Sequence, residues 1–131
     1  MKTGSAICED WLHTIAQQGE LDAYTAPQLG DAVTAALEEG FSWLLVDLSG
    51  VEYIDSVGLG ILIGAAKRAG ERGGDLAVVS ARRNVRKVFD VSGTAEMLNV
   101  VEDVVQAVDR LNAVREARAS QTADAEGGEE Q

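Results

Sequence analysis

The chain has 131 residues, 46% of them hydrophobic and only 5% aromatic, and its formal net charge is −11. This length suits one compact domain with an aliphatic core and is too short for two ordinary domains. One cysteine and one histidine exclude an intrachain disulfide framework and a standard structural zinc site, and the acidic charge argues against nucleic acid or an anionic membrane surface as a partner.

The N-terminal region predicts two short extended segments within residues 6–17, separated by a turn around Asp10. The side chains of residues 12–17 alternate with a weak period of two, which is typical of a half-buried strand. The sequence Gly-Glu-Leu-Asp at residues 19–22 follows directly. It predicts a bend that leads the chain out of the strand.

The next segment predicts a helix that begins after Thr25 and ends at Gly40. Thr25 is suited to the N-cap, and Pro27 is tolerated in the first turn because its missing N–H matters least there. A glycine just past the last turn is a common helix terminator. The apolar positions that recur every four residues are Leu29, Val33 and Leu37.

Two continuous apolar runs, Trp43–Leu48 and Leu76–Val79, have the length of strands. Runs of this kind are typical of strands that are covered on both faces, as in the middle of a parallel sheet. Between them lies a helical segment from Val57 to Arg72. Strand, helix and strand in this order predict a βαβ unit with a right-handed crossover.

The remaining elements are a short helix, a brief strand and a last amphipathic helix. The short helix begins near Arg82, and its apolar face contains Val85, Val88 and Phe89. Residues 97–101 predict an edge strand. The acidic pair Glu102 and Asp103 opens the last helix at its positive end. The apolar stripe of that helix contains Val104, Val105, Val108 and Leu111.

These elements predict an α/β fold in a single domain over residues 1–114, followed by an acidic, disordered tail over residues 115–131. After Arg118 the sequence has no apolar periodicity and an excess of acidic residues. No apolar run approaches the roughly 20 residues needed to span a bilayer, and the N-terminus lacks a hydrophobic segment of signal-peptide length. We therefore expect a cytoplasmic protein without membrane insertion.

The most informative stretch is residues 46–70, and within it the helix start at Ser56. A hydroxyl at the N-cap accepts a hydrogen bond from a backbone N–H one turn in, which explains this serine on grounds of stability alone. Asp55 precedes it, and Gly58 and Gly60 follow, although glycine is costly in a helix. These glycines leave the backbone and hydroxyl unshielded, as an approaching active site requires. The functional interpretation is that Ser56 accepts a phosphate.

The two faces of this helix differ in character. At about 100° per residue, the predicted buried face contains Leu59, Leu62, Ile63, Ala66 and Ala69. The predicted outward face contains Val57, Gly60, Ile61, Gly64 and Arg68. Apolar side chains beside bare glycine favour a docking patch for a partner. The alternative is that a loop of the same chain covers Val57 and Ile61.

A phosphate on Ser56 would lie at the positive end of the helix and face free N–H groups, so we expect the fold to tolerate it. It would also add about −1.5 to −2 charge beside Asp55 and at the edge of the apolar patch. Modification is therefore expected to leave the domain folded and to disrupt binding. This is the behaviour of a binary binding switch.

Three motifs in this order resemble the STAS domain family, and within it the anti-sigma factor antagonists. They are GELD at residues 19–22, VDLS at residues 46–49 and IDSVGLG at residues 54–60. The resemblance covers about residues 6–112. It implies a four- to five-stranded, mostly parallel (mixed) sheet with helices packed against it.

The resemblance also implies a function. The unphosphorylated protein is expected to bind an anti-sigma factor, a serine kinase of the GHKL ATPase type, and thereby release the sigma factor. The kinase uses ATP to phosphorylate Ser56, and a separate serine phosphatase resets it. Asp22 and Asp55 match positions that support the kinase contact, and Val57 stands where smaller residues are common. The alternative with the same fold is a stand-alone adaptor subunit of a membrane transport complex.

Other candidate sites are explained more simply. His13 has no nucleophile nearby, and Ser56 has no matching base or oxyanion motif, so we expect no enzymatic activity. Three carboxylates, Asp22, Asp47 and Asp55, are conceivable metal ligands. Asp47 is better explained by capping a strand end before the helix, so we expect neither a metal nor a cofactor.

One basic cluster stands out in this acidic chain. It contains Arg82, Arg83, Arg86 and Lys87. A solvated helix face explains it most simply. The functional alternative is a contact with an acidic partner surface or with a nucleotide phosphate, and the sequence alone leaves this open.

Overall fold

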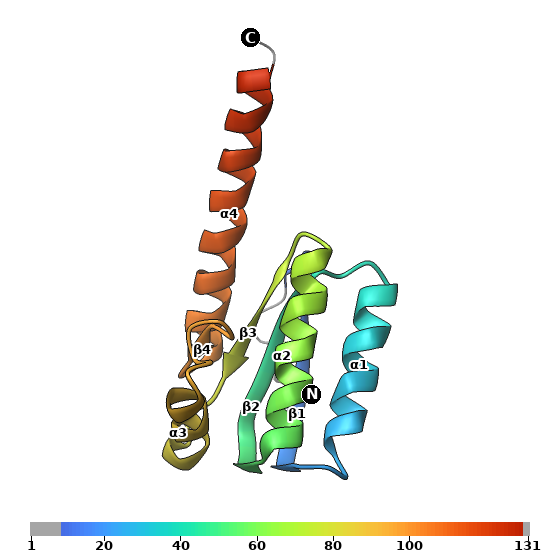
Figure 1. Ribbon diagram of the computed structural model, residues 1–131, viewed down its shortest axis with the longest axis vertical. Helices are drawn as coiled ribbons and strands as arrows, with labels where there is room; N and C mark the ends of the chain where they lie inside the picture. The colour runs from blue at the N-terminus through green and yellow to red at the C-terminus, as the bar shows by residue number, and fades with distance from the viewer. Residues whose placement is uncertain (1–8, 130–131) are drawn as a thin grey trace.

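The computed structural model describes the backbone of residues 9–129 and the side chains of residues 9–120. Strands and helices alternate along the chain, as the apolar patterns predicted (Figure 1). In order, they are β1 (Leu12–Leu21), α1 (Ala26–Glu38), β2 (Trp43–Ile54), α2 (Ser56–Glu71), β3 (Asp75–Val79), α3 (Arg83–Ser92), β4 (Val100–Val101) and α4 (Val104–Glu129).

The four strands form one sheet in the order β1-β2-β3-β4, and every neighbouring pair is parallel. Each strand pairs in parallel with the next one along the chain. A connection must therefore bring the chain back each time to the end of the sheet at which the strands begin. The expectation of a single α/β domain with a four- to five-stranded, mostly parallel sheet is confirmed. Within the described residues all strand pairs are parallel.

The sheet is covered on both faces, which explains the continuous apolar run in β2. Alternate residues of a strand point to opposite faces. Leu44, Val46 and Leu48 join the core beneath α1, α2 and α3, whereas Leu45 packs with Ala107 and Leu111 of α4. Figure 1 shows α1 and α2 side by side on the first face.

Strands β1 and β2 are longer than their sequences predicted. The segment at residues 19–21 stays in β1 and does not bend away, and β2 continues past Leu48 to Ile54. Gly19 adopts a φ of 81°, a conformation that favours glycine, and the pairing shifts register on both sides of it. These irregularities let the two strands stay paired across sequences that read as turns. The bend begins at Asp22.

The shorter elements agree with the sequence except at β4. The turn at Asp10 is present, and α3 ends at Gly93 with a left-handed φ of 76°. Strand β4 contains two residues instead of the predicted 97–101, because Leu98 and Asn99 donate backbone hydrogen bonds to Thr94 and Glu96 in turns. The first of the two predicted N-terminal extended segments lies largely outside the described residues.

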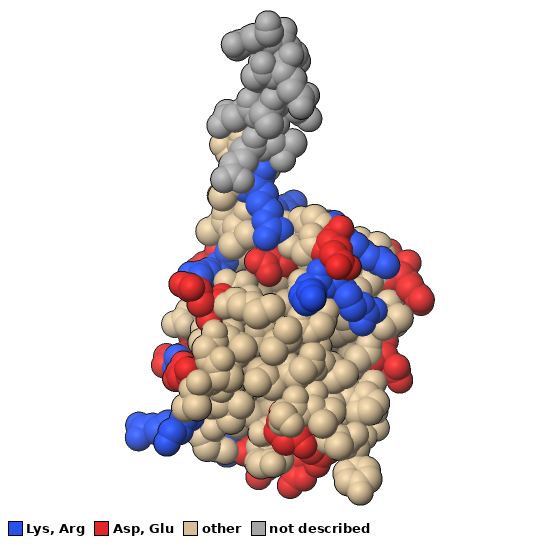
Figure 2. Space-filling view, in the orientation of Figure 1, with Lys and Arg blue, Asp and Glu red and all other residues tan. Residues whose placement is uncertain are grey.

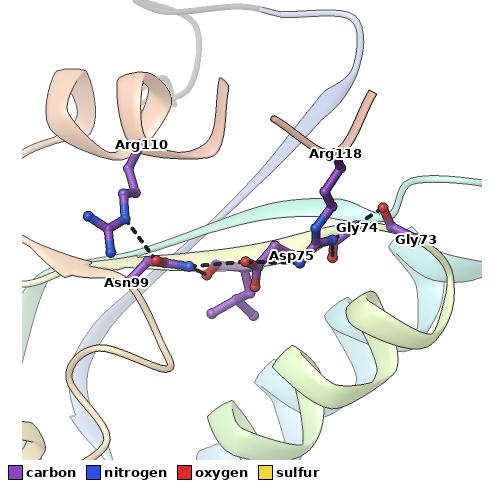
Figure 3. A network of polar contacts seen from close by, with 7 residues as sticks. Gly73, Gly74, Asp75, Asn99, Arg110 and Arg118 are labelled. Atoms are coloured by element: carbon purple, nitrogen blue, oxygen red, sulfur yellow. Dashed lines mark hydrogen bonds and ion pairs between the residues drawn. The ribbon is translucent and has the colours of Figure 1, made fainter. Parts of the chain in front are cut away.

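Helix α4 is attached to the sheet beyond the predicted domain boundary at residue 114. The Arg115 guanidinium lies 4.5 Å from the ring centroid of Trp11, and that of Arg118 lies 5.5 Å from that of Trp43. Arg118 also donates to the carbonyl of Gly74 and lies 3.6 Å from the Asp75 carboxylate (Figure 3). Contacts with the domain therefore extend past residue 115, and the tail over residues 115–131, with its expected disorder, stays a prediction.

Candidate functional site

The end of β1 and the start of α2 meet at the carboxyl edge of the sheet. The backbone N–H of Asp55 donates to the carbonyl of Leu21 at 3.2 Å. This bond joins the loop after β2 to the last residue of β1, so the motifs at residues 19–22 and 54–60 come together in space. The carboxyl edge of a parallel α/β sheet is where such folds usually place their functional loops.

Asp55 caps α2, and Ser56 is the first residue of the helix. The Asp55 carboxylate accepts hydrogen bonds from the N–H groups of Val57 at 2.9 Å and Gly58 at 3.0 Å. The predicted Ser56 N-cap is therefore wrong by one residue, since aspartate suits this position as well as serine. As a result the Ser56 hydroxyl is exposed and has no hydrogen-bond partner among the described residues.

The N-terminus of α2 holds fewer free N–H groups than the sequence suggested. Asp55 occupies those of Val57 and Gly58 through its carboxylate and that of Leu59 through its carbonyl, at 3.0 Å. Only the N–H of Ser56 itself remains for a new ligand in that turn. A phosphate on Ser56 would thus share the helix terminus with a carboxylate that already neutralises it, which corrects the expectation of a free anion site.

The glycines of α2 serve two different purposes. Gly58 is buried, and a Cβ added there would lie 2.5 Å from the Leu21 carbonyl oxygen, closer than any side chain tolerates. Gly58 therefore permits the close approach of α2 to β1 and does not itself face a partner. No atom would lie within 4 Å of a Cβ added at Gly60 or Gly64, so these two glycines leave the helix surface open as predicted.

The buried face of α2 is rotated from the one that the helical wheel predicted. The fully buried residues are Gly58, Leu62, Ala65, Ala66 and Ala69, whereas Leu59 and Ile63 are half-buried at the edge of the core. The rotation follows from Gly58 and Ala65, whose small side chains allow close packing on the sheet. The helical-wheel prediction placed the largest hydrophobic side chains on the buried face and did not include Gly58 and Ala65 in it.

Part of the predicted docking patch faces α1 of the same chain. Ile61 is half-buried, and its Cδ1 would lie 3.6 Å from a Cβ added at Gly30. Arg68 donates a hydrogen bond to the Thr34 hydroxyl at 2.7 Å. The same-chain alternative is therefore the better description of Ile61, although a helix and not a loop covers it. Val57 remains 43% exposed and stays available to a partner.

Asp22 shapes the turn that leaves β1. Its carboxylate accepts hydrogen bonds from the N–H groups of Tyr24 at 3.0 Å and Thr25 at 3.1 Å. The bond from Thr25 in particular holds the pKa of Asp22 below its usual value, because it stabilises the charged carboxylate. Thr25 is the N-cap residue of α1, as predicted, but its hydroxyl donates to the carbonyl of Glu20 at 2.6 Å and makes no capping hydrogen bond. Asp22 makes no hydrogen bond to Asp55 or Ser56 among the described residues.

Two exposed tyrosines lie on the segments that carry the motifs at residues 19–22 and 54–60, and the sequence analysis missed them. Tyr24 is 89% exposed in the turn after β1, and Tyr53 is 50% exposed three residues before Ser56. Exposed tyrosines are common anchors in protein interfaces. The sequence did contain a signal for them, because both tyrosines stand next to the two motifs in a chain with few aromatic residues. Together with Val57 they are exposed aromatic and aliphatic side chains on the two segments that the Asp55–Leu21 bond joins.

The residues that were considered as metal ligands or catalytic groups and set aside, Asp47 and His13, make other contacts within the domain. Asp47 lies within β2, not at its end as predicted, and accepts hydrogen bonds from the N–H and hydroxyl of Ser49 at 2.9 and 2.6 Å. The His13 ring packs 4.9 Å from that of Phe41. Across the described residues, no three histidine, cysteine or acidic side chains are arranged to hold a metal ion, and no helix there could span a membrane.

Comparisons with known proteins agree on one family. The model of a family described as "Mlab, STAS domain" matches residues 13–102. An anti-sigma-B factor antagonist of Staphylococcus epidermidis is 30% identical over 96 residues, which are 73% of this chain and 89% of that protein. The crystal structure of an anti-sigma factor antagonist from Mycobacterium paratuberculosis is 27% identical, with a TM-score of 0.72 over 80% of this chain and 89% of the other.

A likeness in fold extends further. SpoIIAA, a Bacillus cell fate determinant solved in its phosphorylated form, is 22% identical and has a TM-score of 0.62 over 79% of this chain and 94% of its own. At that identity the comparison shows a shared fold. The sheet order and the helix that begins at Ser56 are thus features of a recurrent architecture.

Proposed function

This chain belongs to the STAS domain family, among the anti-sigma factor antagonists, and from that premise we propose that it is a binding protein controlled by phosphorylation of Ser56. In its unphosphorylated form it binds an anti-sigma factor that is a serine kinase of the GHKL ATPase type, and the sigma factor is released. Phosphorylation of Ser56 ends this binding, and a serine phosphatase restores it.

The observation that carries the proposal is the free hydroxyl at the start of α2. Because Asp55 caps the helix, the Ser56 side chain is exposed and makes no hydrogen bond with any residue that the structure describes. A serine retained only for stability would be expected to cap the helix itself. Three exposed side chains on the same two segments, Tyr24, Tyr53 and Val57, offer a partner apolar surface from which water can be excluded.

The electrostatics of the site explain how one phosphate would end binding. The modification adds about −1.5 to −2 charge next to the Asp55 carboxylate. The amides that could neutralise this charge already bond to Asp55. In the free protein water solvates the phosphate, whereas a docked partner would have to bury it beside a second negative charge. Phosphorylation is therefore expected to destabilise the complex with the partner and to leave the stability of the free domain unchanged.

The chemistry of the switch belongs to the partner enzymes. The Ser56 Oγ forms a bond to the γ-phosphorus of ATP, the bond from that phosphorus to the ADP oxygen breaks, and the hydroxyl proton passes to a base of the kinase. No base contacts Ser56 among the described residues of this chain. The chain contributes the acceptor hydroxyl and the surface that positions it.

Intact mass after incubation with ATP and candidate anti-sigma kinases from the same genome tests the proposal. We expect the gain of one phosphate on the wild-type chain and none on Ser56→Ala. A phosphate that persists on Ser56→Ala would place the acceptor elsewhere. No gain with any kinase, together with recovery of a membrane transport complex in a pull-down, would support the adaptor alternative.

A further inference from the structure

Helix α3 carries an apolar groove on the surface of the domain. The groove has a volume of ≈ 380 Å³ and is lined by Asn84, Lys87, Val88, Val91 and Ser92. The first four of these lie at i, i+3, i+4 and i+7 and share one side of the helix, away from the buried Val85 and Phe89. Val91 is 77% exposed, more than any other large aliphatic side chain described. Aliphatic side chains exposed along one helix face favour a docking site.

Basic side chains lie on α3 beside the groove: Lys87 lines it, and Arg83 lines a neighbouring hollow that also contains Asp90 and Glu102. Residues 82–87 contain four basic side chains and no acidic one, in a chain of net charge −11. Arg86 pairs with Glu102 at 2.7 Å. Arg82, Arg83 and Lys87 are exposed, and none of them forms an ion pair with any described residue. Three cations thus remain for an external partner.

The groove lies at the same end of the domain as Ser56. The Asn84 side chain donates a hydrogen bond of 2.8 Å to the carbonyl of Glu52, near the end of β2. Figure 1 shows α3 at the end of the sheet from which α2 departs. Between Ser56 and Ala66 the sequence of α2 contains no charged residue. Accordingly, the centre of this face is uncharged, and charged side chains lie at its rim (Figure 2).

We propose that the α3 groove binds an acidic, amphipathic helix of the anti-sigma factor, so that the partner contacts both Ser56 and α3. Apolar side chains of that helix would pack on Val88 and Val91, and its carboxylates would face Arg82, Arg83 and Lys87. The inference rests on the proposed function, because it names a second contact of the same partner. A groove on one helix face suits an amphipathic helix with apolar anchors at i, i+3 or i+4, and i+7.

Charge complementarity favours this occupant over a second copy of the chain. A symmetric contact between two antiparallel α3 helices, centred on the groove, would bring the Lys87 side chains of both copies together, and like charges at an interface oppose association. An acidic helix neutralises the three cations instead. Its attraction would raise the association rate at low ionic strength and weaken as salt screens the charges.

Two matched valine substitutions test the groove. Val91→Glu places a negative charge in it, whereas Val105→Glu makes the same change at a 57% exposed valine on α4. Binding is measured by calorimetry against the anti-sigma factor that phosphorylates the wild-type chain. We expect the Kd to rise at least about tenfold for Val91→Glu and less than about twofold for Val105→Glu, with unchanged melting temperatures. Arg83→Glu should slow association and flatten its salt dependence.

Ser56→Asp, measured in parallel, separates the two proposals. If Ser56→Asp abolishes binding and Val91→Glu behaves like Val105→Glu, the groove is not part of the interface and the inference falls alone. If Val91→Glu weakens binding and Ser56→Asp does not, the α3 groove is part of the interface, and the proposal that Ser56 controls binding is wrong. If wild-type protein sediments as a dimer that Val91→Glu dissociates, a second copy fills the groove, which also overturns the inference.

Discussion

At the start of α2, neighbouring residues have separate roles: Asp55 stabilises the helix, and Ser56 presents a hydroxyl to the outside. The carboxylate of Asp55 satisfies two N–H groups that would otherwise have no partner. Because the cap is complete without it, Ser56 can be modified without removing a stabilising contact. Stability and switching can therefore be measured independently at adjacent positions.

Replacement of Asp55 tests the capping role. Asp55→Ala should lower the free energy of unfolding by about 1 kcal/mol, whereas Asp55→Asn should retain most of the stability, because asparagine also caps helices. Urea denaturation of both variants measures the difference. Equal loss in both would mean that the charge of Asp55, and not its hydrogen bonds to Val57 and Gly58, stabilises the helix.

Gly58 and Gly60 form a matched pair for the packing of α2. Gly58→Ala should destabilise the domain by about 1–3 kcal/mol, because the new Cβ would meet the Leu21 carbonyl at 2.5 Å. Gly60→Ala meets no atom within 4 Å and should stabilise the helix by about 0.5–1 kcal/mol. Thermal unfolding of the two variants checks both signs. A stable Gly58→Ala would show that α2 can move away from β1 at little cost.

The turn at Asp22 predicts a pH dependence of stability. The pKa of Asp22 is lowered in the folded protein, chiefly by the hydrogen bond from the N–H of Thr25, from its ordinary value of 3.8. Its contribution should be fully present above pH 3.8 and be lost as the pH falls through the lower folded-state pKa. The difference in stability between wild type and Asp22→Asn should therefore narrow below pH 3.8. A difference that is constant with pH would show that the charge of Asp22 does not contribute.

At the scale of elements, the sequence predicts those helices and strands whose limits are set by their own residues. The apolar runs at Trp43–Leu48 and Leu76–Val79 identified the central strands, because burial on both faces demands continuous hydrophobicity. The extension of β2 to Ile54 was missed, because Ser49 and Gly50 resemble a turn and only the pairing with β1 keeps them in the strand. Strand pairing depends on two segments, so the sequence of β2 alone does not predict how far its pairing with β1 extends.

The faces of α2 illustrate the same limit. Its period predicted a helix correctly, yet the packing of α1 beside it decides that Ile61 is covered and Val57 is not. Asn99 was missed for a related reason. Its side chain bonds to the carbonyl of Leu76 and accepts from Arg110, and so links α4 to the start of β3 (Figure 3).

The attachment of α4 depends on arginines stacked on tryptophans. Replacing Arg115 and Arg118 together by alanine should shift the tryptophan emission and speed amide exchange in the second half of α4, because both rings and the Gly74 carbonyl lose their partners. Arg83→Ala is the control, since Arg83 is exposed and forms no ion pair among the described residues. Unchanged exchange in the double variant would show that the buried Ala107 and Leu111, with the hydrogen bond between Arg110 and Asn99, hold α4 without these arginines.

Over the whole molecule, the surfaces have separate purposes. One face of the sheet is closed by α4, whereas the end that carries Ser56 combines free apolar side chains, open glycines and the cations of α3. The α3 cluster contains four of the eleven basic residues of a chain whose net charge is −11. Basic side chains also gather at the opposite end of the domain (Figure 2), so the attraction of an acidic partner to α3 would be local.

The most direct test of the switch is calorimetric titration of the cognate anti-sigma kinase, with ADP and no ATP, by the unphosphorylated and the phosphorylated chain. We predict that phosphorylation of Ser56 weakens binding at least about a hundredfold, or about 2.7 kcal/mol, while Ser56→Ala binds like the unmodified protein and all three forms melt at similar temperatures. Equal affinity of the phosphorylated and unphosphorylated chains would contradict the proposal that Ser56 controls this interface.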